Sequence, residues 1–427
     1  MQIRSIIFRF LLVLLILENA HHLVAQEKTG QEISIQHLID EALQNNPDYL
    51  AATKQLGSAR AQIPQAGALP DPKLGLALMN LPVNSFEFDQ EPMTGKKISL
   101  MQMFLFPGKL GLREDMAEYQ AQVVEQQVEE LKNNLVKNVK MIYYNLFFVD
   151  KSIEIVEKNK ALIKQFVKVA ETKYSVGKGL QQDVLKAQVE LSKMTDKLIS
   201  LQQKRANLVF QLNKLLNRNS NAPIDKLLDL KKSNLELNLD DIKEIGLKNR
   251  PLLNSWNFMI EKTKSATRLA KKGYLPDLSV GVAYTQRDDL RTGMKMYDFF
   301  SAEVSLDLPL YFFKKQSKEV EEKQLMVTST EEKYAAVKNE VLFQIENAFS
   351  ELEKDNKLID LYETGIIPQA SQSLNAAVSG YQVDKVDFLT LLNNQVTLFN
   401  YEMEYYRVLS DHEKSLAELE VAVGTRF

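Results

Sequence analysis

The sequence LIDEALQNNP at residues 38–47 returns as IKEIGLKNRP at residues 242–251. Two further motifs return in the same order: LPD at 69–71 recurs at 275–277, and YSV at 174–176 recurs as YQV at 381–383. The separations are 204, 206 and 207 residues, so the two copies stay in register over nearly the whole chain. Solenoid units are much shorter, about 20–50 residues. The sequence therefore predicts a duplicated half-molecule, in which each half holds the same order of helices and strands.

The N-terminus has the pattern of an export signal. Arg4 and Arg9 precede the apolar run 10–17, and the segment closes on a small residue, Ala25. This pattern predicts a signal peptide over residues 1–25 with cleavage after Ala25. The apolar run is shorter than the roughly 20 residues of a transmembrane helix, and an uncleaved signal anchor is the alternative. The chain contains no Cys, so it forms no disulfide.

Composition argues against several classes of function. The 427 residues carry a net charge of −3, and both signs of charge are interspersed. Nucleic-acid binding would need a basic patch with interleaved aromatic residues, and nothing in the sequence indicates one. The chain has four His and no Cys, and no spacing typical of a catalytic or metal motif. We expect no enzyme activity, no cofactor and no resident metal site. We interpret the methionines near the strand segments as flexible apolar side chains that fill space in the packing. The alternative is that they pass a soft metal ion along the strands.

Each half contains a long segment with the apolar spacing of a coiled coil. In the first half, apolar residues recur at steps of three and four that average about 3.5. They are Val128, Leu131, Leu135, Val139, Ile142, Leu146, Val149, Ile153 and Val156. We expect helical hairpins over about 113–217 and 315–424. An exported spectrin-like rod is the alternative at this point.

Two segments in each half have the period of a β-strand. Residues 277–287 and 300–311 alternate apolar with small or acidic side chains, and residues 73–82 and 97–106 do so more weakly. Each has about ten residues, the length of a tilted strand that crosses a bilayer. An apolar face opposite a small or acidic face indicates an outer-membrane barrel. A half-buried hairpin on a soluble domain is the alternative.

Four strands cannot close a barrel, and the two open edges are not tolerated in lipid. Three chains would supply twelve strands, an even number within the known range. The predicted fold is mainly α with a small β part. Long coiled-coil hairpins form a trimeric helical barrel, and each chain adds four transmembrane strands to a shared twelve-stranded β-barrel. The predicted divisions are a signal peptide (1–25), a first structural repeat (26–232) and a second structural repeat (233–427).

The chain resembles the TolC-like outer-membrane efflux proteins over essentially its whole mature length. The resemblance rests on ALQNNP at 42–47, the two LPD motifs, FLFPGK at 104–109, and the closing pattern from Tyr381 to Gly424. Each motif alone is weak, whereas the ordered and duplicated set is specific. The stretch 92–109 is most similar to the heavy-metal efflux branch of copper or cobalt-zinc-cadmium type.

The resemblance implies a transport role. It implies a homotrimer in the outer membrane of a Gram-negative bacterium, extending into the periplasm. It also implies a periplasmic adaptor (a membrane fusion protein) and an inner-membrane pump of the RND type as partners. The expected function is the exit duct of a tripartite efflux system for metal ions or small toxic compounds. The alternatives are the outer-membrane duct of a type I protein secretion system and an exported coiled-coil scaffold without a pore.

The resemblance also implies a periplasmic gate at the hairpin tips. Asp183 matches an Asp at the start of the first half's second helix, and Tyr381 matches the Tyr that precedes the second half's turn. A contact between these two side chains would latch the closed state. The family's partner Arg falls on Val386, so the ionic part of that latch is absent.

Three further positions belong to the same expected gate. The two acidic ring positions of the resembling proteins fall on Thr390 and Asn393. Asp387 lies one turn away. It is either a ring residue or the N-cap of the following helix.

Overall fold

The computed structural model describes residues 33–427, and the predicted signal peptide with its cleavage site lies outside them. The described elements run in the same order in both halves. They are α2 (Ile35–Asn45), α3 (Pro47–Gly67), β1 (Lys73–Met79), β2 (Gly95–Phe104), α4 (Lys109–Ser175), α5 (Gln181–Leu215), α6 (Leu239–Asn249), α7 (Pro251–Lys272), β3 (Asp277–Gln286), β4 (Phe299–Asp307), α8 (Gln316–Leu361), the π turn η2 (Tyr362–Ile366), α9 (Ile367–Gln382) and α10 (Phe388–Val423). Among these helices, none combines the length and the apolarity that a bilayer crossing requires.

The repeated motif that opens each half forms two consecutive helices. The Ser34 hydroxyl accepts a hydrogen bond from the His37 N–H at the start of α2, and the Asn238 side chain accepts one from the Asp241 N–H at the start of α6. Both helices have 11 residues and end just before a proline. Proline has no N–H and suits the first turn of the next helix, so α3 and α7 begin at the repeated prolines.

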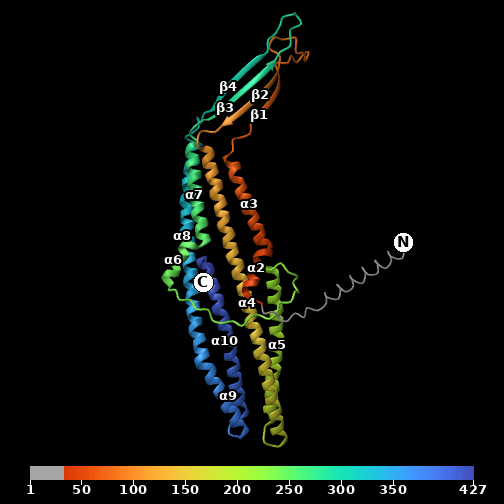
Figure 1. Ribbon diagram of the computed structural model, residues 1–427, viewed down its shortest axis with the longest axis vertical. Helices are drawn as coiled ribbons and strands as arrows, with labels where there is room; N and C mark the ends of the chain where they lie inside the picture. The colour runs from red at the N-terminus through yellow and green to blue at the C-terminus, as the bar shows by residue number, and fades with distance from the viewer. Residues whose placement is uncertain (1–32) are drawn as a thin grey trace, which may run out of the picture. The chain divides into compact units, whose positions relative to one another are not determined.

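The four strands form one antiparallel sheet in the order β1-β2-β3-β4 (Figure 1). The central pair joins the two halves, with Met101 of β2 opposite Gly281 of β3. On β3, Val280 and Val282 are exposed, whereas Gly281 and Ala283, which alternate with them, are buried. The apolar face of the sheet therefore lacks cover among the described residues, as do the outer edges of β1 and β4.

The strands and one helix differ from the expected bounds for local reasons. β1 ends at Met79 rather than 82 because Asn80 has a left-handed backbone, with φ 49°. β4 ends at Asp307 rather than 311, just before Pro309, which cannot donate to a strand ladder. The first arm of the helical hairpin expected over about 315–424 is divided by η2. Pro368 follows at the second position of α9 and removes one helical hydrogen bond, which accounts for the wider turn.

The chain divides into two compact units. The first unit takes residues up to Asn46, 136–234 and 352–415, and it contains both hairpin turns. The second unit takes 47–135, 235–351 and 416–427, and it contains the sheet. Each unit draws on both sequence halves, because equivalent elements of the two halves pack side by side.

Candidate functional site at the hairpin tips

In the first unit, the ends of four helices pack on one apolar cluster. The cluster takes residues from α4, α5, α9 and α10: Ile163, Phe166, Ala170, Ala187, Leu374, Ala377, Tyr381, Phe388, Leu391 and Leu392. Each hairpin therefore covers apolar surface of the other near its turn. Tyr381 belongs to this cluster, and the other residues expected at the gate lie on the same helices or on the turn before α10.

The first turn joins α4 to α5 through two glycines. Gly177 has a φ of +74°, a backbone that favours glycine. The N–H of Lys178 donates to the carbonyl of Lys173 at 2.8 Å and closes the end of α4. Asp183 lies half-buried in the first turn of α5, where a carboxylate interacts favourably with the helix dipole.

The second turn joins α9 to α10 and is fastened by aspartates. Asp384 has a left-handed backbone, with φ 60°. The Asp387 carboxylate accepts the N–H of Thr390 at 2.9 Å and the Thr390 hydroxyl at 2.8 Å. This is the geometry of an N-cap. The two hydrogen bonds from Thr390 lower the pKa of Asp387, the backbone N–H contributing most.

Lys173, on the last turn of α4, connects the two turns. Its Nζ donates to the Tyr381 carbonyl at 2.6 Å and to the Asp384 carboxylate, and it lies 4.1 Å from the centroid of the Tyr381 ring. The Lys173 side chain is 18% exposed, whereas that of Asp384 is 60% exposed. The hydrogen bond from Lys173 is the main cause that lowers the pKa of Asp384. An ion pair, a hydrogen bond and a cation–π contact thus converge on one ammonium group.

Tyr381 is buried and packs its ring edge-on against Phe388, with centroids 5.7 Å apart. Burial raises the pKa of Tyr381 most, and the negative charges of Asp183 and Asp384 raise it further. Asp183 is therefore close enough to act on Tyr381 through its charge. Within residues 33–427, no hydrogen bond joins the Tyr381 hydroxyl to Asp183.

Val386 has a packing role in the position where the resembling proteins carry an Arg. Its side chain lies over Gly380, where a Cβ would come within 2.5 Å of Val386 Cγ2. It also packs against the apolar cluster. Gly380 is therefore required by close approach rather than by its backbone angles.

Thr390 and Asn393 are both exposed on α10. Asn393 lines a hollow of about 550 Å³ between α10 and α5, whose apolar wall is Leu185, Val189, Leu389, Leu392 and Val396. The structure thus brings Asp183, Tyr381, Asp387 and Thr390 to the two neighbouring turns, and Asn393 to the helix face that follows.

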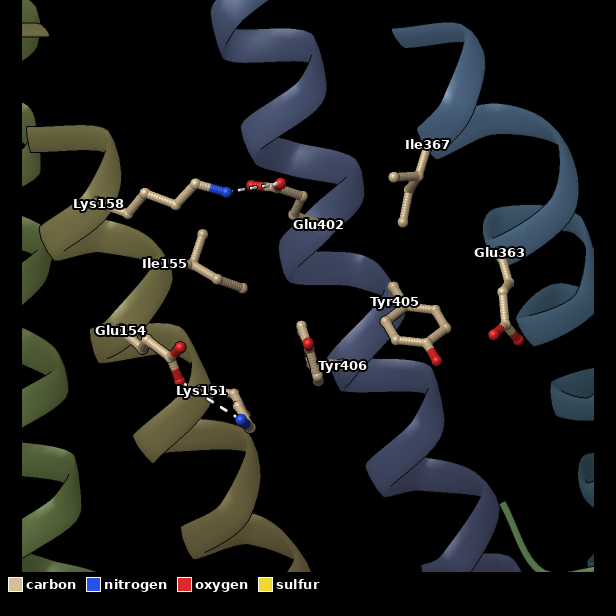
Figure 2. Close-up of a pocket in the computed structure, with 9 residues that line it drawn as sticks. All are labelled: Lys151, Glu154, Ile155, Lys158, Glu363, Ile367, Glu402, Tyr405 and Tyr406. Atoms are coloured by element: carbon tan, nitrogen blue, oxygen red, sulfur yellow. Dashed lines mark hydrogen bonds and ion pairs between the residues drawn. The ribbon is translucent and has the colours of Figure 1, made fainter. Parts of the chain in front are cut away.

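A second hollow of about 340 Å³ lies in the same unit, between α4, α10 and η2 (Figure 2). Lys158 approaches Glu402 at 3.6 Å, and Lys151 approaches Glu154 at 3.4 Å. A third carboxylate, Asp229, binds Lys151 at 2.8 Å and is the main cause that raises its pKa. Both lysines therefore have carboxylate partners, and the hollow presents no unpaired cation.

Within residues 33–427, no group of three or more His, Cys, Asp or Glu side chains could hold a metal ion. The expected gate residues lie together without a nucleophile paired to a base. Their contacts join the ends of neighbouring helices.

Sequence reasoning missed Lys173 and Asp384. The resemblance directed attention to the position of Val386, which lies on the second turn, whereas the cation comes from the first hairpin. The signal that could have identified Lys173 is its position in the last turn of α4, because a basic side chain there can bind the free carbonyl groups at the end of a helix. Its partner across the turns became evident only from the packing.

The comparisons with known proteins agree with this architecture. A model of the outer membrane efflux protein family matches residues 38–218 and 244–425, one segment in each half. The cobalt-zinc-cadmium resistance protein CzcC of Cupriavidus metallidurans is 18% identical over 399 residues, covering 92% of this chain and 90% of CzcC. A crystal structure of CusC superimposes with a TM-score of 0.79 at 18% identity, over 92% of both chains. The outer membrane protein VceC of Vibrio cholerae superimposes with a TM-score of 0.78 at 18% identity, over 92% of this chain and 96% of VceC.

Paired helical hairpins with a four-stranded sheet define a class of TolC-like channel proteins. The chain belongs to the outer membrane efflux protein family. Members of this family are channels rather than enzymes.

Proposed function

We propose that this chain is the exit duct of a tripartite efflux system, built from three copies and spanning the outer membrane. The open sheet carries this proposal. Its apolar face is exposed on every strand, and both of its edges lack partners among the described residues. An unpaired strand edge in lipid leaves backbone groups unsatisfied. Three copies of a four-stranded sheet remove every edge and leave a lumen lined by the opposite face, which carries small and acidic side chains together with Lys73, Lys97 and Met101.

The helical part would extend into the periplasm of a Gram-negative bacterium and meet a periplasmic adaptor and an inner-membrane pump of the RND type. CzcC, a relative over most of both chains, is described as a cobalt-zinc-cadmium resistance protein. This relationship supports divalent metal ions as the cargo. The metal passes through the duct as a substrate and needs no resident site.

The gate of this duct would be the two hairpin turns. The contact of Lys173 with Tyr381 and Asp384, which we name the tip contact, would hold the two hairpins of each copy together. Asp183 would add charge near Tyr381, Asp387 would fix the start of α10, and Thr390 and Asn393 would line the narrow end. An adaptor that binds the open arrangement more tightly would shift the population toward it.

Two measurements test this proposal: the mass of the extracted protein and its conductance in lipid bilayers. Protein extracted from outer membranes in mild detergent should have the mass of three mature chains, and it should form discrete conducting steps in planar lipid bilayers. A monomeric mass with intact secondary structure would contradict the shared barrel. A trimer that never conducts would favour the scaffold without a pore.

A further inference from the structure

The seam between the two halves of one chain contains a specific set of contacts. β2 and β3 pair with Met101 opposite Gly281 and Leu100 opposite Val282. Just beyond the sheet, Lys109 at the start of α4 binds Asp277 at the start of β3, with Nζ and Oδ1 2.8 Å apart. The same Asp277 oxygen accepts the Phe106 N–H at 2.7 Å. An ion pair therefore marks the place where a strand of one half meets a strand of the other.

The two β-hairpins have the same register. The pair Lys73 and Met101 corresponds to the pair Ser279 and Ser305, and this correspondence continues to the last pair of each ladder. Residues of β3 lie 206 positions after their counterparts in β1, and residues of β4 lie 204 positions after their counterparts in β2. The sequence supports the first offset independently, because LPD at 69–71 recurs at 275–277 and Gly75 corresponds to Gly281. The β2–β3 seam can therefore serve as a template for a seam between copies.

We propose that β4 of one copy pairs with β1 of a second copy in the register that places Ser305 opposite Gly75 of the second copy. We further propose that Lys315 there binds Asp71 of the second copy, as Lys109 binds Asp277 within one chain. The inference rests on the proposed three-copy assembly and adds its register and its ion pair. Ser305 and Gly75 correspond to Met101 and Gly281, which are opposite each other in the template.

The side chains brought together by this register are complementary. Asp307 falls opposite Lys73, an opposite-charge pair of the kind that stabilises adjacent strands. Val304 falls opposite Leu76, so the apolar faces of the two copies become continuous. A slip of one residue would place these apolar side chains on the opposite face. Every residue of β4 is exposed in the single chain, as expected for a strand that lacks its neighbour.

The proposed ion pair uses two groups that the single chain leaves without a partner. Asp71 lies two residues before β1 and is the +206 counterpart of Asp277, which begins β3. Lys315 directly precedes α8, as Lys109 begins α4, but it lies 10 residues after Ser305, whereas Lys109 lies 8 residues after Met101, so the connection before α8 is two residues longer. Both Asp71 and Lys315 are exposed, and neither belongs to an ion pair within residues 33–427. In the corresponding ion pair within one chain, the Lys109 side chain is only 10% exposed where it contacts Asp277. We expect the proposed pair to shield Lys315 from solvent in the same way.

Engineered cysteines test the register directly, because the natural chain contains none. The proposed register places Glu303 opposite Ala77, which corresponds to the observed pair Ser99 and Ala283. The variant Glu303→Cys/Ala77→Cys should form covalent dimers and trimers under mild oxidation. The variant Glu303→Cys/Met79→Cys, shifted by two residues, should form roughly fivefold less, because cysteines with Cα atoms more than about 7 Å apart cannot be bridged. The variant Ser99→Cys/Ala283→Cys is the positive control and should lose its free thiols within one chain.

Each outcome is decisive. Greater cross-linking by the shifted pair would overturn the register. Absence of cross-linking by Glu303→Cys/Ala77→Cys would also overturn it, provided that the protein is trimeric and the control pair closes. A monomeric mass of the parent protein would instead overturn the three-copy assembly, which separates failure of the inference from failure of the proposed function.

Charge exchange tests the ion pair. Asp71→Lys and Lys315→Asp should each lower the temperature at which the trimer dissociates in detergent, and the double variant should recover most of the loss. Lys314→Asp, on the neighbouring exposed lysine, is the matched control and should not be rescued by Asp71→Lys. Equal rescue by both lysine positions, or no rescue at either, would overturn the assignment of Lys315.

Discussion

At the scale of single residues, the tip contact depends on one ammonium group with three partners. Lys173 binds the carbonyl of Tyr381 and the carboxylate of Asp384, and it lies over the Tyr381 ring. The tyrosine hydroxyl takes no part in these contacts. The strength of the contact should therefore follow Lys173 more closely than the hydroxyl of Tyr381.

We predict that Lys173→Met raises the conductance of the reconstituted channel, because it removes the ion pair, the hydrogen bond and the cation–π contact while keeping a long side chain. Tyr381→Phe should have a smaller effect, since the ring and the carbonyl remain. Lys385→Met is the matched control, a lysine on the exposed surface of the same turn. Single-channel recording measures all three. Equal conductance of Lys173→Met and the parent would mean that the gate lies elsewhere, with Asp387 the next candidate.

The lowered pKa of Asp384 predicts how the contact responds to acid. A carboxylate whose pKa is depressed in the contact, below its ordinary value of 3.8, stabilises the contact above that value. This stabilisation is lost as the pH falls through the depressed pKa. Conductance should therefore be insensitive to this group from pH 8 to about 5 and should rise only below the ordinary Asp range. Asp384→Asn should conduct more at pH 7 and show no such acid-induced rise. An acid-induced rise of equal size in Asp384→Asn would assign it to another group.

Gly380 offers a test of the packing at the second turn. A Cβ at this position would lie 2.5 Å from Val386 Cγ2, so Gly380→Ala should destabilise the turn by about 1–3 kcal/mol through overpacking. Adding Val386→Ala should relieve the clash. Gly111→Ala is the control, because nothing lies within 4 Å of its added Cβ. Thermal unfolding in detergent distinguishes these variants, and an equal loss for Gly380→Ala and Gly111→Ala would contradict the assigned contact.

At the scale of elements, β4 has an apolar side and a polar side, which the proposed barrel would turn toward lipid and toward the lumen. Val304 and Ser305 are neighbours with opposite orientations, and both are exposed in the single chain. A cation facing lipid near the midplane costs about 2–4 kcal/mol, so Val304→Arg should lower the yield of inserted protein. Ser305→Arg should be tolerated better because its side chain would face water. Equal yields in the outer-membrane fraction would mean that the faces are assigned wrongly.

At the scale of the whole molecule, the proposed function predicts that the duct exports divalent metal ions. Deleting the gene should make the host more sensitive to cobalt, zinc or cadmium salts, and the parent chain should restore growth. Val304→Arg should restore less than Ser305→Arg, since fewer ducts would insert. Unchanged metal sensitivity together with increased sensitivity to organic toxic compounds would assign the duct to a different cargo.

The repeat, the helical hairpins and the strand segments could be predicted from the sequence, because apolar spacing is a local property and the motifs occur twice. Alternation predicts the strands near 73–82 and 277–287, and the coiled-coil spacing of apolar residues predicts the helical hairpins. The bounds of β1 and β4 and the π turn could not be read in this way. They depend on the backbone of Asn80 and on the hydrogen bonds that Pro309 and Pro368 cannot make.

The sequence by itself determined the duplication, the helix and strand types, and the membership of the family, since these follow from residue order and spacing. Only the tertiary structure decided which charged groups meet. Lys173 and Asp384 lie 211 residues apart, and Lys109 and Asp277 lie 168 apart. Neither pair leaves a periodic trace in the sequence, because an ion pair between distant segments depends on how the helices and strands pack rather than on the pattern of either segment.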